Sequence, residues 1–336
     1  MNNNQIPDHF KELLFASQQK NLVYNYNFLY FSNKTIKDKP DNYDYGHPDG
    51  WIYKGNGKIG FNDIKNCCYI DTDTENMVFS QALHEFPRWM DLLIGQTVTA
   101  KAHLNLENDA TIKFSLSDGI TTKTSSISSS GDIEMQVQLK VNEDAKRLKL
   151  KIECDTANIV INISKVYANI GSTALASNPC IVNGVIGERK QYIATENTPA
   201  EELSLCKASE ELKSDYSRLD SVLNKRFGAG PNNISLLPDM RGYFSRAWNN
   251  DSGIDTGANN RTNLGKSDIT GDHVSTAELD EFKEHDHTVP FVDGAVVAGE
   301  ASLNLIINKE NTSTSKTGGK ETRPKNIAEL YTIKWA

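Results

Sequence analysis

The sequence predicts a mainly β protein, in which a two-sheet β-sandwich is followed by an irregular, loop-rich α+β region with one main helix. Between residues 21 and 171, short alternating or apolar runs recur and are broken by Gly, Asn, Asp and Ser. Strands in this rhythm are typical of β-sandwiches. One stretch with helical periodicity follows at 209–227, and the long polar stretch after Arg246 indicates loops.

The composition disfavours nucleic acid and the membrane interior as partners of this chain. The chain has 336 residues, a formal net charge of −8 and 38% hydrophobic residues. A negative charge without a basic patch disfavours nucleic acid, because phosphate binding requires clustered Lys and Arg. No apolar run reaches the ~20 residues that span a bilayer, so we expect no membrane insertion. The five cysteines form no CxxC motif and are expected to be free thiols.

Two segments flank the expected sandwich at 21–171. Residues 1–20 are interpreted as an N-terminal arm or helix, because Phe10 and Leu14 fall on one side of a helical pattern. Residues 172–186 are rich in small side chains and are interpreted as a linker.

Within the sandwich, residues 98–104 and 148–152 alternate between apolar and polar side chains, which predicts strands with one buried face. The strand rhythm and the turn from Pro48 to Trp51 resemble the jelly-roll domains of carbohydrate-binding modules and of phage tail proteins. We expect Trp51 in the core, since aromatic residues of a sandwich are more often core than sugar platforms. A sugar-binding role is the alternative.

The main helix is predicted at 209–227, where apolar residues such as Leu212 and Leu219 recur at spacings of three and four. Ser209 is the expected N-cap residue. Gly228 is expected to end the helix, since glycine readily adopts the left-handed backbone of a helix terminus.

Four sequence blocks resemble, in the right order, the phage tail-collar family. They are GERKQYIA with TPAEELSLC (187–206), LLPDMRGYFSRAW (236–248), ELDEFKEHDH (278–287) and ETRPKNIAELYTIKWA (321–336). The resemblance covers under half of the chain and implies that residues 187–336 form a tail-collar-like trimerisation and receptor-binding domain. In the second block, we expect Asp239, Arg241 and Arg246 to form charge-assisted bonds that hold irregular backbone in place.

The resemblance implies a homotrimeric tail fibre or receptor-binding protein. Such an adhesin is a virion component of a phage or of a phage-like contractile particle, and is made in the bacterial cytoplasm. Its partners would be further copies of itself, baseplate proteins, and a cell-surface glycan or protein bound for host attachment. The polar loops 249–275 and 308–320 are the expected contact surface, since Asn, Ser, Thr and Asp can hydrogen-bond sugar hydroxyls.

Two other functions stay open at this point. The chain could be a structural baseplate or collar component that binds no receptor. A polysaccharide depolymerase is the weaker alternative, because such enzymes usually carry a long repeated β-helix and no such repeat occurs. The chain also contains no GxGxxG, P-loop, GxSxG or HExxH motif, so we predict that it is not an enzyme.

His285 and His287 are the candidate metal ligands. If the chain is extended there, both imidazoles point to one face, because side chains of a strand alternate. In the trimer that the resemblance implies, three chains would place their imidazoles around a shared axis. Such a ligand set suits an octahedral ion such as Fe²⁺, with Zn²⁺, which usually takes four ligands, as the alternative. The other interpretation is that both histidines face solvent or bond to loop atoms.

Replacement of both histidines tests this structural metal. The double variant His285→Ala with His287→Ala is expected to lose the ion and to melt at a lower temperature, because the site would exist only where chains meet. The sandwich should stay folded. Elemental analysis and thermal unfolding of both proteins would check this, and an unchanged melting temperature would contradict the metal role.

Overall fold

The computed structural model describes residues 7–33, 47–73, 77–265, 268–280 and 324–336. Contacts divide the chain into two units, one of residues 1–277 with 329–336 and one of residues 278–328. All the described helices and strands belong to the first unit. The predicted fold class is confirmed, since the chain is mainly β with a sandwich and few helices. The domain boundaries inferred from the sequence stay predictions.

In the described part of the first unit, eight strands form one antiparallel sheet. The strand order is β1-β4-β7-β5-β8-β3-β2, and β6 also pairs with β5. The bounds are β1 (Ile52–Lys54), β2 (Lys58–Asn62), β3 (Cys67–Asp71), β4 (Met77–Ala82), β5 (Thr97–Ser117), β6 (Thr122–Lys140), β7 (Lys149–Cys154) and β8 (Val160–Ile170).

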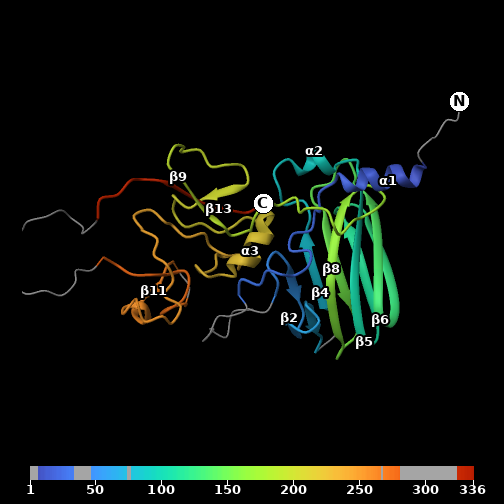
Figure 1. Ribbon diagram of the computed structural model, residues 1–336, viewed down its shortest axis with the longest axis horizontal. Helices are drawn as coiled ribbons and strands as arrows, with labels where there is room; N and C mark the ends of the chain where they lie inside the picture. Colours follow the sequence, from blue (N-terminus) through green and yellow to red (C-terminus); the bar gives the residue numbers. More distant parts are fainter. Residues whose placement is uncertain (1–6, 34–46, 74–76, 266–267, 281–323) are drawn as a thin grey trace, which may run out of the picture. The chain divides into compact units, whose positions relative to one another are not determined.

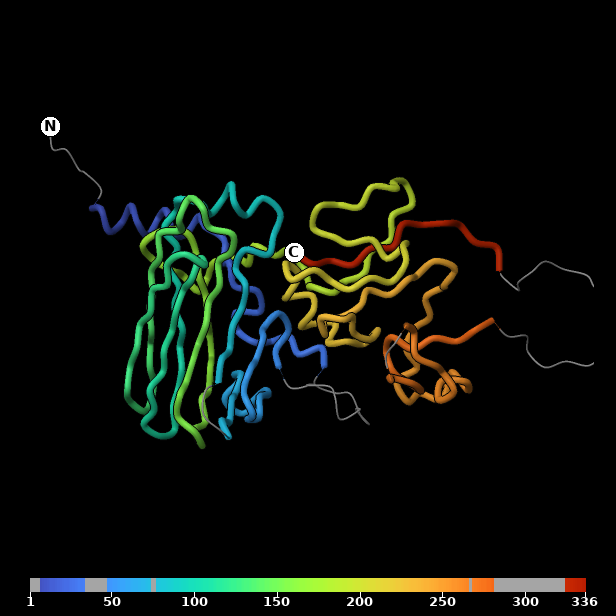
Figure 2. Tube along the Cα trace, turned by 180° about the vertical axis from the view of Figure 1, so that it is seen from behind, coloured from blue at the N-terminus to red at the C-terminus, as the bar shows by residue number. Residues whose placement is uncertain are grey.

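Strand β5 links the two halves of the sandwich. Its first part, up to Leu106, pairs with β8, and its second part, from Ile112, pairs with β7, while β6 follows both parts. The register shifts between Leu106 and Ala110, where a bulge of exposed residues interrupts the ladder. Buried side chains alternate on both sides of this bulge, so both halves line one apolar core. Figure 1 shows β5 and β6 as long neighbouring strands, and Figure 2 shows them from behind.

The predicted turn before β1 is present and places a tryptophan in the core. Trp51 is fully buried, and its ring stacks on Phe79 with 4.5 Å between the ring centroids. Its backbone N–H donates to Pro48 O at 3.1 Å. Gly50 has a φ of +81°, and a Cβ there would lie 2.6 Å from the Tyr24 ring. The turn therefore requires glycine, and Trp51 is a core residue as expected.

Helix α1 (Asp8–Ser17) confirms the helical pattern near the N-terminus. Ala16 is the buried residue of this helix, whereas Phe10 and Leu14 are exposed. Asn178 donates to Ala16 O at 2.8 Å and fixes the end of the helix. A second short helix is α2 (Trp89–Leu93). No described helix is both long and apolar enough to cross a membrane.

The apolar run at 21–31, the first in the region of the expected sandwich, forms no strand. Asn25 and Phe28 have φ angles of 50° and 58°, which no β-strand accommodates. The Asn25 side chain takes the place of a strand partner, because it donates to Tyr30 O at 2.8 Å and accepts from Tyr30 N at 3.0 Å. The segment is still largely buried, so its apolar content reflects packing.

A smaller sheet follows the sandwich. Strands β9 (Arg189–Tyr192), β10 (Glu202–Ser204) and β13 (Leu330–Lys334) pair in the order β10-β13-β9. Buried Glu202 accepts hydrogen bonds from Thr332 and Tyr192, at 2.5 and 2.7 Å. The remaining short elements are η2 (Ala258–Asn260), β11 (Thr262–Asn263) and β12 (Thr276–Ala277).

The predicted main helix is much shorter than 209–227. It consists of the 3₁₀ turn η1 (Ser214–Tyr216) and α3 (Ser217–Leu223), and it ends at Asn224, whose φ is 44°. Ser209 is not its N-cap, since the Ser209 hydroxyl donates to Leu237 O at 2.6 Å. The expected start at Ser209 and the expected end at Gly228 are therefore both wrong.

A carboxylate from the sandwich side determines where α3 begins. Glu85 follows β4, is 2% exposed, and accepts hydrogen bonds at 2.8 Å from both Ser217 N and Arg218 N. The fully buried Arg218 guanidinium donates to Leu22 O at 2.9 Å and to Glu85 O at 3.4 Å. Burial raises the pKa of the Glu85 carboxyl and lowers the pKa of Arg218. Attraction between the two charges opposes both of these pKa shifts, and hydrogen bonds to the backbone satisfy each group.

Removal of this carboxylate should destabilise the protein strongly. Glu85→Ala leaves the Arg218 charge buried without its partner, and we expect a loss of about 3–5 kcal/mol in the free energy of unfolding. Glu85→Gln, which keeps an acceptor at the start of α3, should lose less.

Urea unfolding would measure both changes. The control is Asp155→Ala, which breaks the exposed pair between Lys113 and Asp155 and should leave stability almost unchanged. A similar small effect for Glu85→Ala would show that the buried pair does not hold α3.

Candidate functional site

The candidate metal ligands His285 and His287 lie outside the described residues, as does the loop 308–320. The metal site therefore stays a prediction. Among the residues that the structure describes, no group of three or more His, Cys, Asp or Glu side chains could hold a metal ion. The loop 249–275 is described except for residues 266–267, and its polar contacts can be examined directly.

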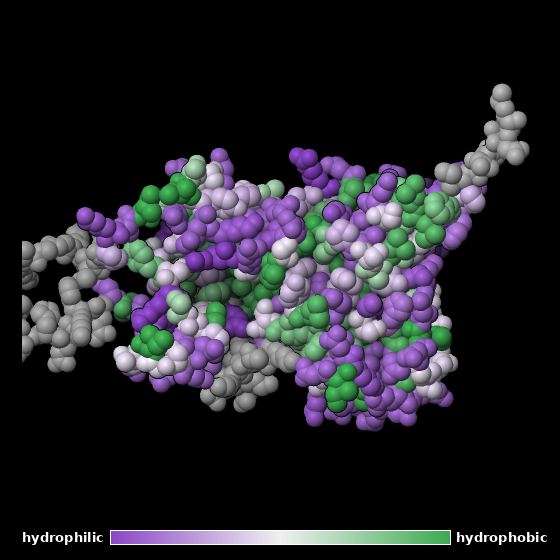
Figure 3. Space-filling view, in the orientation of Figure 1, coloured by the Kyte–Doolittle hydropathy of each residue, from purple (hydrophilic) through white to green (hydrophobic). Residues whose placement is uncertain are grey.

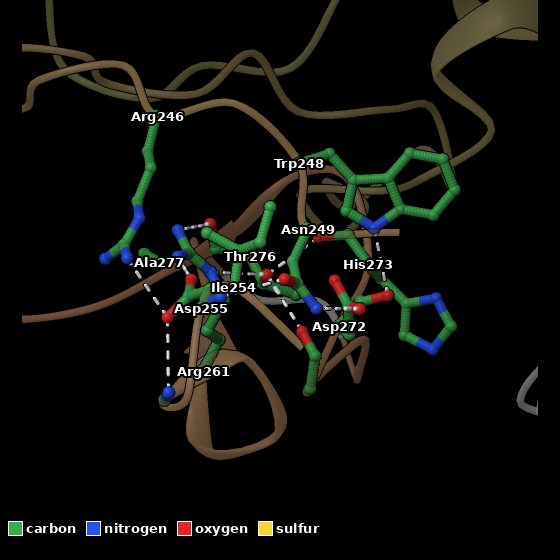
Figure 4. A network of polar contacts seen from close by, with 12 residues as sticks. Arg246, Trp248, Asn249, Ile254, Asp255, Arg261, Asp272, His273, Thr276 and Ala277 are labelled. Atoms are coloured by element: carbon green, nitrogen blue, oxygen red, sulfur yellow. Dashed lines mark hydrogen bonds and ion pairs between the residues drawn. The ribbon is translucent and has the colours of Figure 1, made fainter. Parts of the chain in front are cut away.

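A carboxylate at the centre of this loop binds two arginines. Asp255 accepts from Arg246 at 3.1 Å and from Arg261 at 3.2 Å (Figure 4). Arg261 also donates to Thr276 O at 3.3 Å, which ties the middle of the loop to β12. Asp239 and Arg241 form a second pair nearby in the sequence, with an N–O distance of 2.6 Å. The expectation that these residues hold irregular backbone in place is confirmed.

A second carboxylate holds the other side of the loop. Asp272 accepts from Asp251 N at 2.8 Å and from the Asn249 amide at 2.9 Å. The hydrogen bond from Asp251 N is the main cause that lowers the Asp272 pKa. The Trp248 indole donates to Asp272 O at 3.1 Å, as Figure 4 shows. Many polar groups of this loop thus bond to each other and stabilise the conformation of the loop itself.

Among the exposed apolar side chains of the first unit, two groups lie near segments that the sequence singled out. In the collar-like part, Phe244, Trp248 and Ile254 are 57%, 50% and 87% exposed. On α1, Phe10 and Leu14 are 60% and 53% exposed. Figure 3 shows hydrophobic surface at the upper right, where Figure 1 places α1. Apolar patches of this kind mark contact surfaces in many proteins.

The outer surface of one sandwich half is polar, and we call it the polar face. Side chains at alternating positions of β5 point outward, with those of β6 on one side and those of β8 on the other. Cross-strand partners on this face form rows, such as Asp132, Asn105 and Asn162. The members are Thr99, Lys101, His103, Asn105, Asp132, Glu134, Gln136, Gln138, Asn162, Lys165, Tyr167 and Asn169.

A cavity of about 570 Å³ opens on the polar face. Polar side chains from β5, β6, β8 and the turn before β3 line it. Two strand irregularities adjoin it: the bulge in β5 after Leu106, and a shift in β8 that leaves Ser164 without a partner on β5. Bulges re-aim side chains and are common beside binding sites. The lining residues are Lys65, Cys67, His103, Leu104, Asn105, Asp132, Ile133, Glu134, Asn162 and Ser164.

Asn162 carries an unsatisfied donor beside this cavity. The residue is 3% exposed, and its Nδ2 has no hydrogen-bond partner among the described residues. Its other amide atom, Oδ1, lies 3.7 Å from the Cys67 sulfur. An unpaired buried donor costs about 1–3 kcal/mol, so a partner for this amide would stabilise the site. As expected from the sequence, Cys67 and the other four cysteines are free.

The two acidic residues of the cavity each accept a hydrogen bond from a neighbouring side chain. Asp132 Oδ1 accepts from Asn105 at 2.8 Å, and Glu134 Oε1 accepts from Lys101 at 2.7 Å. The hydrogen bond from Lys101 lowers the pKa of Glu134. A general acid in glycoside hydrolysis needs a raised pKa, so Glu134 is suited to accepting hydrogen bonds from hydroxyls and unsuited to donating a proton.

His103 stands between this site and a buried tyrosine. Its ring stacks on Tyr167 with 5.6 Å between the centroids, and His103 Nε2 lies 3.0 Å from the Tyr167 hydroxyl. Tyr167 is 6% exposed, so its ring is not a platform for a ligand. No feature of the sequence predicts this cavity. Alternation along β5 predicts which of its side chains point outward, but it does not predict which strands pair with β5.

Comparison with curated proteins gives one relative that matches about half of the chain. No family model matches the chain. Protein RhiB from Rhizobium leguminosarum bv. viciae is 26% identical over 175 residues, which cover 49% of this chain and 78% of RhiB. The resemblance to the tail-collar family thus stays a prediction.

Similar solved structures are carbohydrate-binding modules. TmCBM61, solved in complex with β-1,4-galactotriose, is 14% identical, with 44% of this chain and 97% of that chain covered and a TM-score of 0.32. The CBM22-1 xylan-binding domain of Paenibacillus barcinonensis Xyn10C is 17% identical, with 38% and 90% covered and a TM-score of 0.31. These sugars are ligands of those proteins.

Loss of the central carboxylate should loosen the loop 246–277 alone. In Asp255→Ala, two arginines lose their shared acceptor, and we expect hydrogen exchange of this segment to become about tenfold faster, as for a local opening. Mass spectrometry of peptides would locate the change. Asp239→Ala, which breaks an exposed arginine pair before the loop, is the control. Equal exchange in the two variants would mean that Asp255 does not hold the loop.

Proposed function

We propose that this chain is a glycan-binding attachment protein, whose sandwich holds a cell-surface glycan at the polar face. The cavity beside Asn105, Asp132 and Asn162 is the observation that carries the proposal. Its carboxylate and amide groups match the hydroxyls of a sugar, and its volume lies within the range of small-molecule sites.

The assembly that we propose is a homotrimer. The exposed side chains of Phe244, Trp248 and Ile254 support it, because further copies would remove this apolar surface from water. Three weak glycan sites on one particle would also bind a cell surface far more strongly than one site, through effective concentration. An ion held by His285 and His287 would belong to the same assembly.

The place of action that we propose is the tail of a phage or of a phage-like contractile particle. The collar-like blocks support this, since residues 236–248 combine the Asp239–Arg241 pair with the Arg246 contact that anchors the following loop. The exposed apolar face of α1 is the surface that we assign to a baseplate protein. Host attachment would then be the biological role.

A structural baseplate or collar component is the second candidate. The exposed apolar side chains of α1 and of residues 244–254 favour it, because they suit protein partners better than sugars. A depolymerase is the weakest candidate, since the lowered pKa of Glu134 opposes a role as general acid.

Two measurements on the intact protein test the proposal. Light scattering should give the mass of three chains, and a glycan array should show binding to a defined set of glycans. A stable monomer would contradict the trimer. A trimer without glycan binding would favour the structural component, and release of reducing sugar from a host polysaccharide would establish an enzyme.

A further inference from the structure

We infer that the cavity takes an uncharged, hydroxyl-rich sugar and holds it by hydrogen bonds to its edge, without an aromatic platform. This inference rests on the proposed function and specifies the ligand class. It follows from the free hydrogen-bonding groups, from the charges of the lining and from the position of the aromatic rings.

The free groups of the cavity match a chain of hydroxyls. Asp132 Oδ1 is occupied by Asn105, which leaves the second oxygen of this exposed carboxylate for a ligand hydroxyl. Asn162 offers the opposite polarity, because its Nδ2 is a buried donor without a partner in the described chain. A hydroxyl both donates and accepts, so adjacent sugar hydroxyls can satisfy an acceptor and a donor together.

The charges of the lining disfavour an acidic sugar. Among the described side chains that line the cavity, one is a lysine, Lys65. It already forms an ion pair with Glu107, with an N–O distance of 3.4 Å. Glu134 is likewise paired with Lys101, at 2.7 Å. His103, the other lining side chain that can carry a positive charge, faces Glu134 with 3.8 Å between His103 Nδ1 and Glu134 Oε2. A uronate or sialic acid would therefore meet the carboxylate of Asp132, and would have to compete with Glu107 and Glu134 for these cations. A neutral sugar meets no such repulsion.

The rings near the cavity exclude stacking as the main contact. Tyr167 is 6% exposed, and its ring stacks on that of His103, which lines the cavity. Sugar specificity then comes from hydrogen bonds at fixed positions, and a missing or inverted hydroxyl leaves a buried polar group unpaired.

The test uses the full chain and a glycan array that holds neutral, sialylated and uronate-containing glycans, followed by calorimetry with the best free oligosaccharide. Neutral glycans should bind, and acidic ones should bind at least tenfold more weakly. Asn162→Leu and Asp132→Ala should each weaken binding at least tenfold. Asp155→Ala, on the other sandwich half, should bind like the unchanged protein.

The outcomes separate the two claims. Binding of a glycan that is unaffected by Asn162→Leu and Asp132→Ala would overturn this inference and keep the proposed function. Stronger binding of acidic glycans would overturn the ligand class. No binding to any glycan would overturn both. If Asn162→Leu does not fold, Asp132→Asn decides, because Asp132 is exposed and its replacement should weaken neutral and not acidic ligands.

Discussion

The contact between Glu85 and the first turn of α3 is the constraint on which the arrangement of the first unit depends. A carboxylate that is almost fully buried persists there because the backbone N–H groups of Ser217 and Arg218 donate to it and the Arg218 charge attracts it. Such a pair contributes little net stability, yet it penalises any arrangement that separates its members. It therefore fixes one start for α3. From that start, the Ser221 hydroxyl donates to Trp51 O at 2.9 Å, and Leu219 packs into an apolar cluster that also contains Leu212 and Leu237.

Elements that depend on neighbouring residues were predicted correctly, whereas elements that depend on residues distant in the sequence were not. Alternation in β5 and the turn before Trp51 are local signals, and both predictions are confirmed. The start of α3 depends on Glu85, which lies more than a hundred residues earlier, so local periodicity placed it wrongly at Ser209. The apolar run 21–31 forms no strand for a related reason. Its apolar residues are buried, but the Asn25 side chain replaces the ladder that a strand needs.

The candidate site was less accessible to sequence reasoning than the fold. The outward positions Lys101, His103 and Asn105 follow from the alternation in β5, but their neighbours depend on which strands pair with it. Asn105 meets Asp132 on one side and Asn162 on the other, across sequence separations that no local pattern encodes. The composition of the loop 249–275 instead predicted a contact surface there. There the polar side chains serve the loop itself, because Asp255 and Asp272 bind their own segment.

The bulge in β5 after Leu106 accounts both for the cavity and for the way in which β5 joins the two halves of the sandwich. Strand β5 can pair with β8 and then with β7 because its ladder is interrupted after Leu106. The interruption ends the regular rows of the polar face beside Asn105, and Glu107 in the bulge binds Lys65 at the cavity rim. Ser164 gives β8 a matching irregularity on the other side. A flat, regular sheet would leave no hollow between these strands, so the bend that joins the two halves also creates the space that a ligand would occupy.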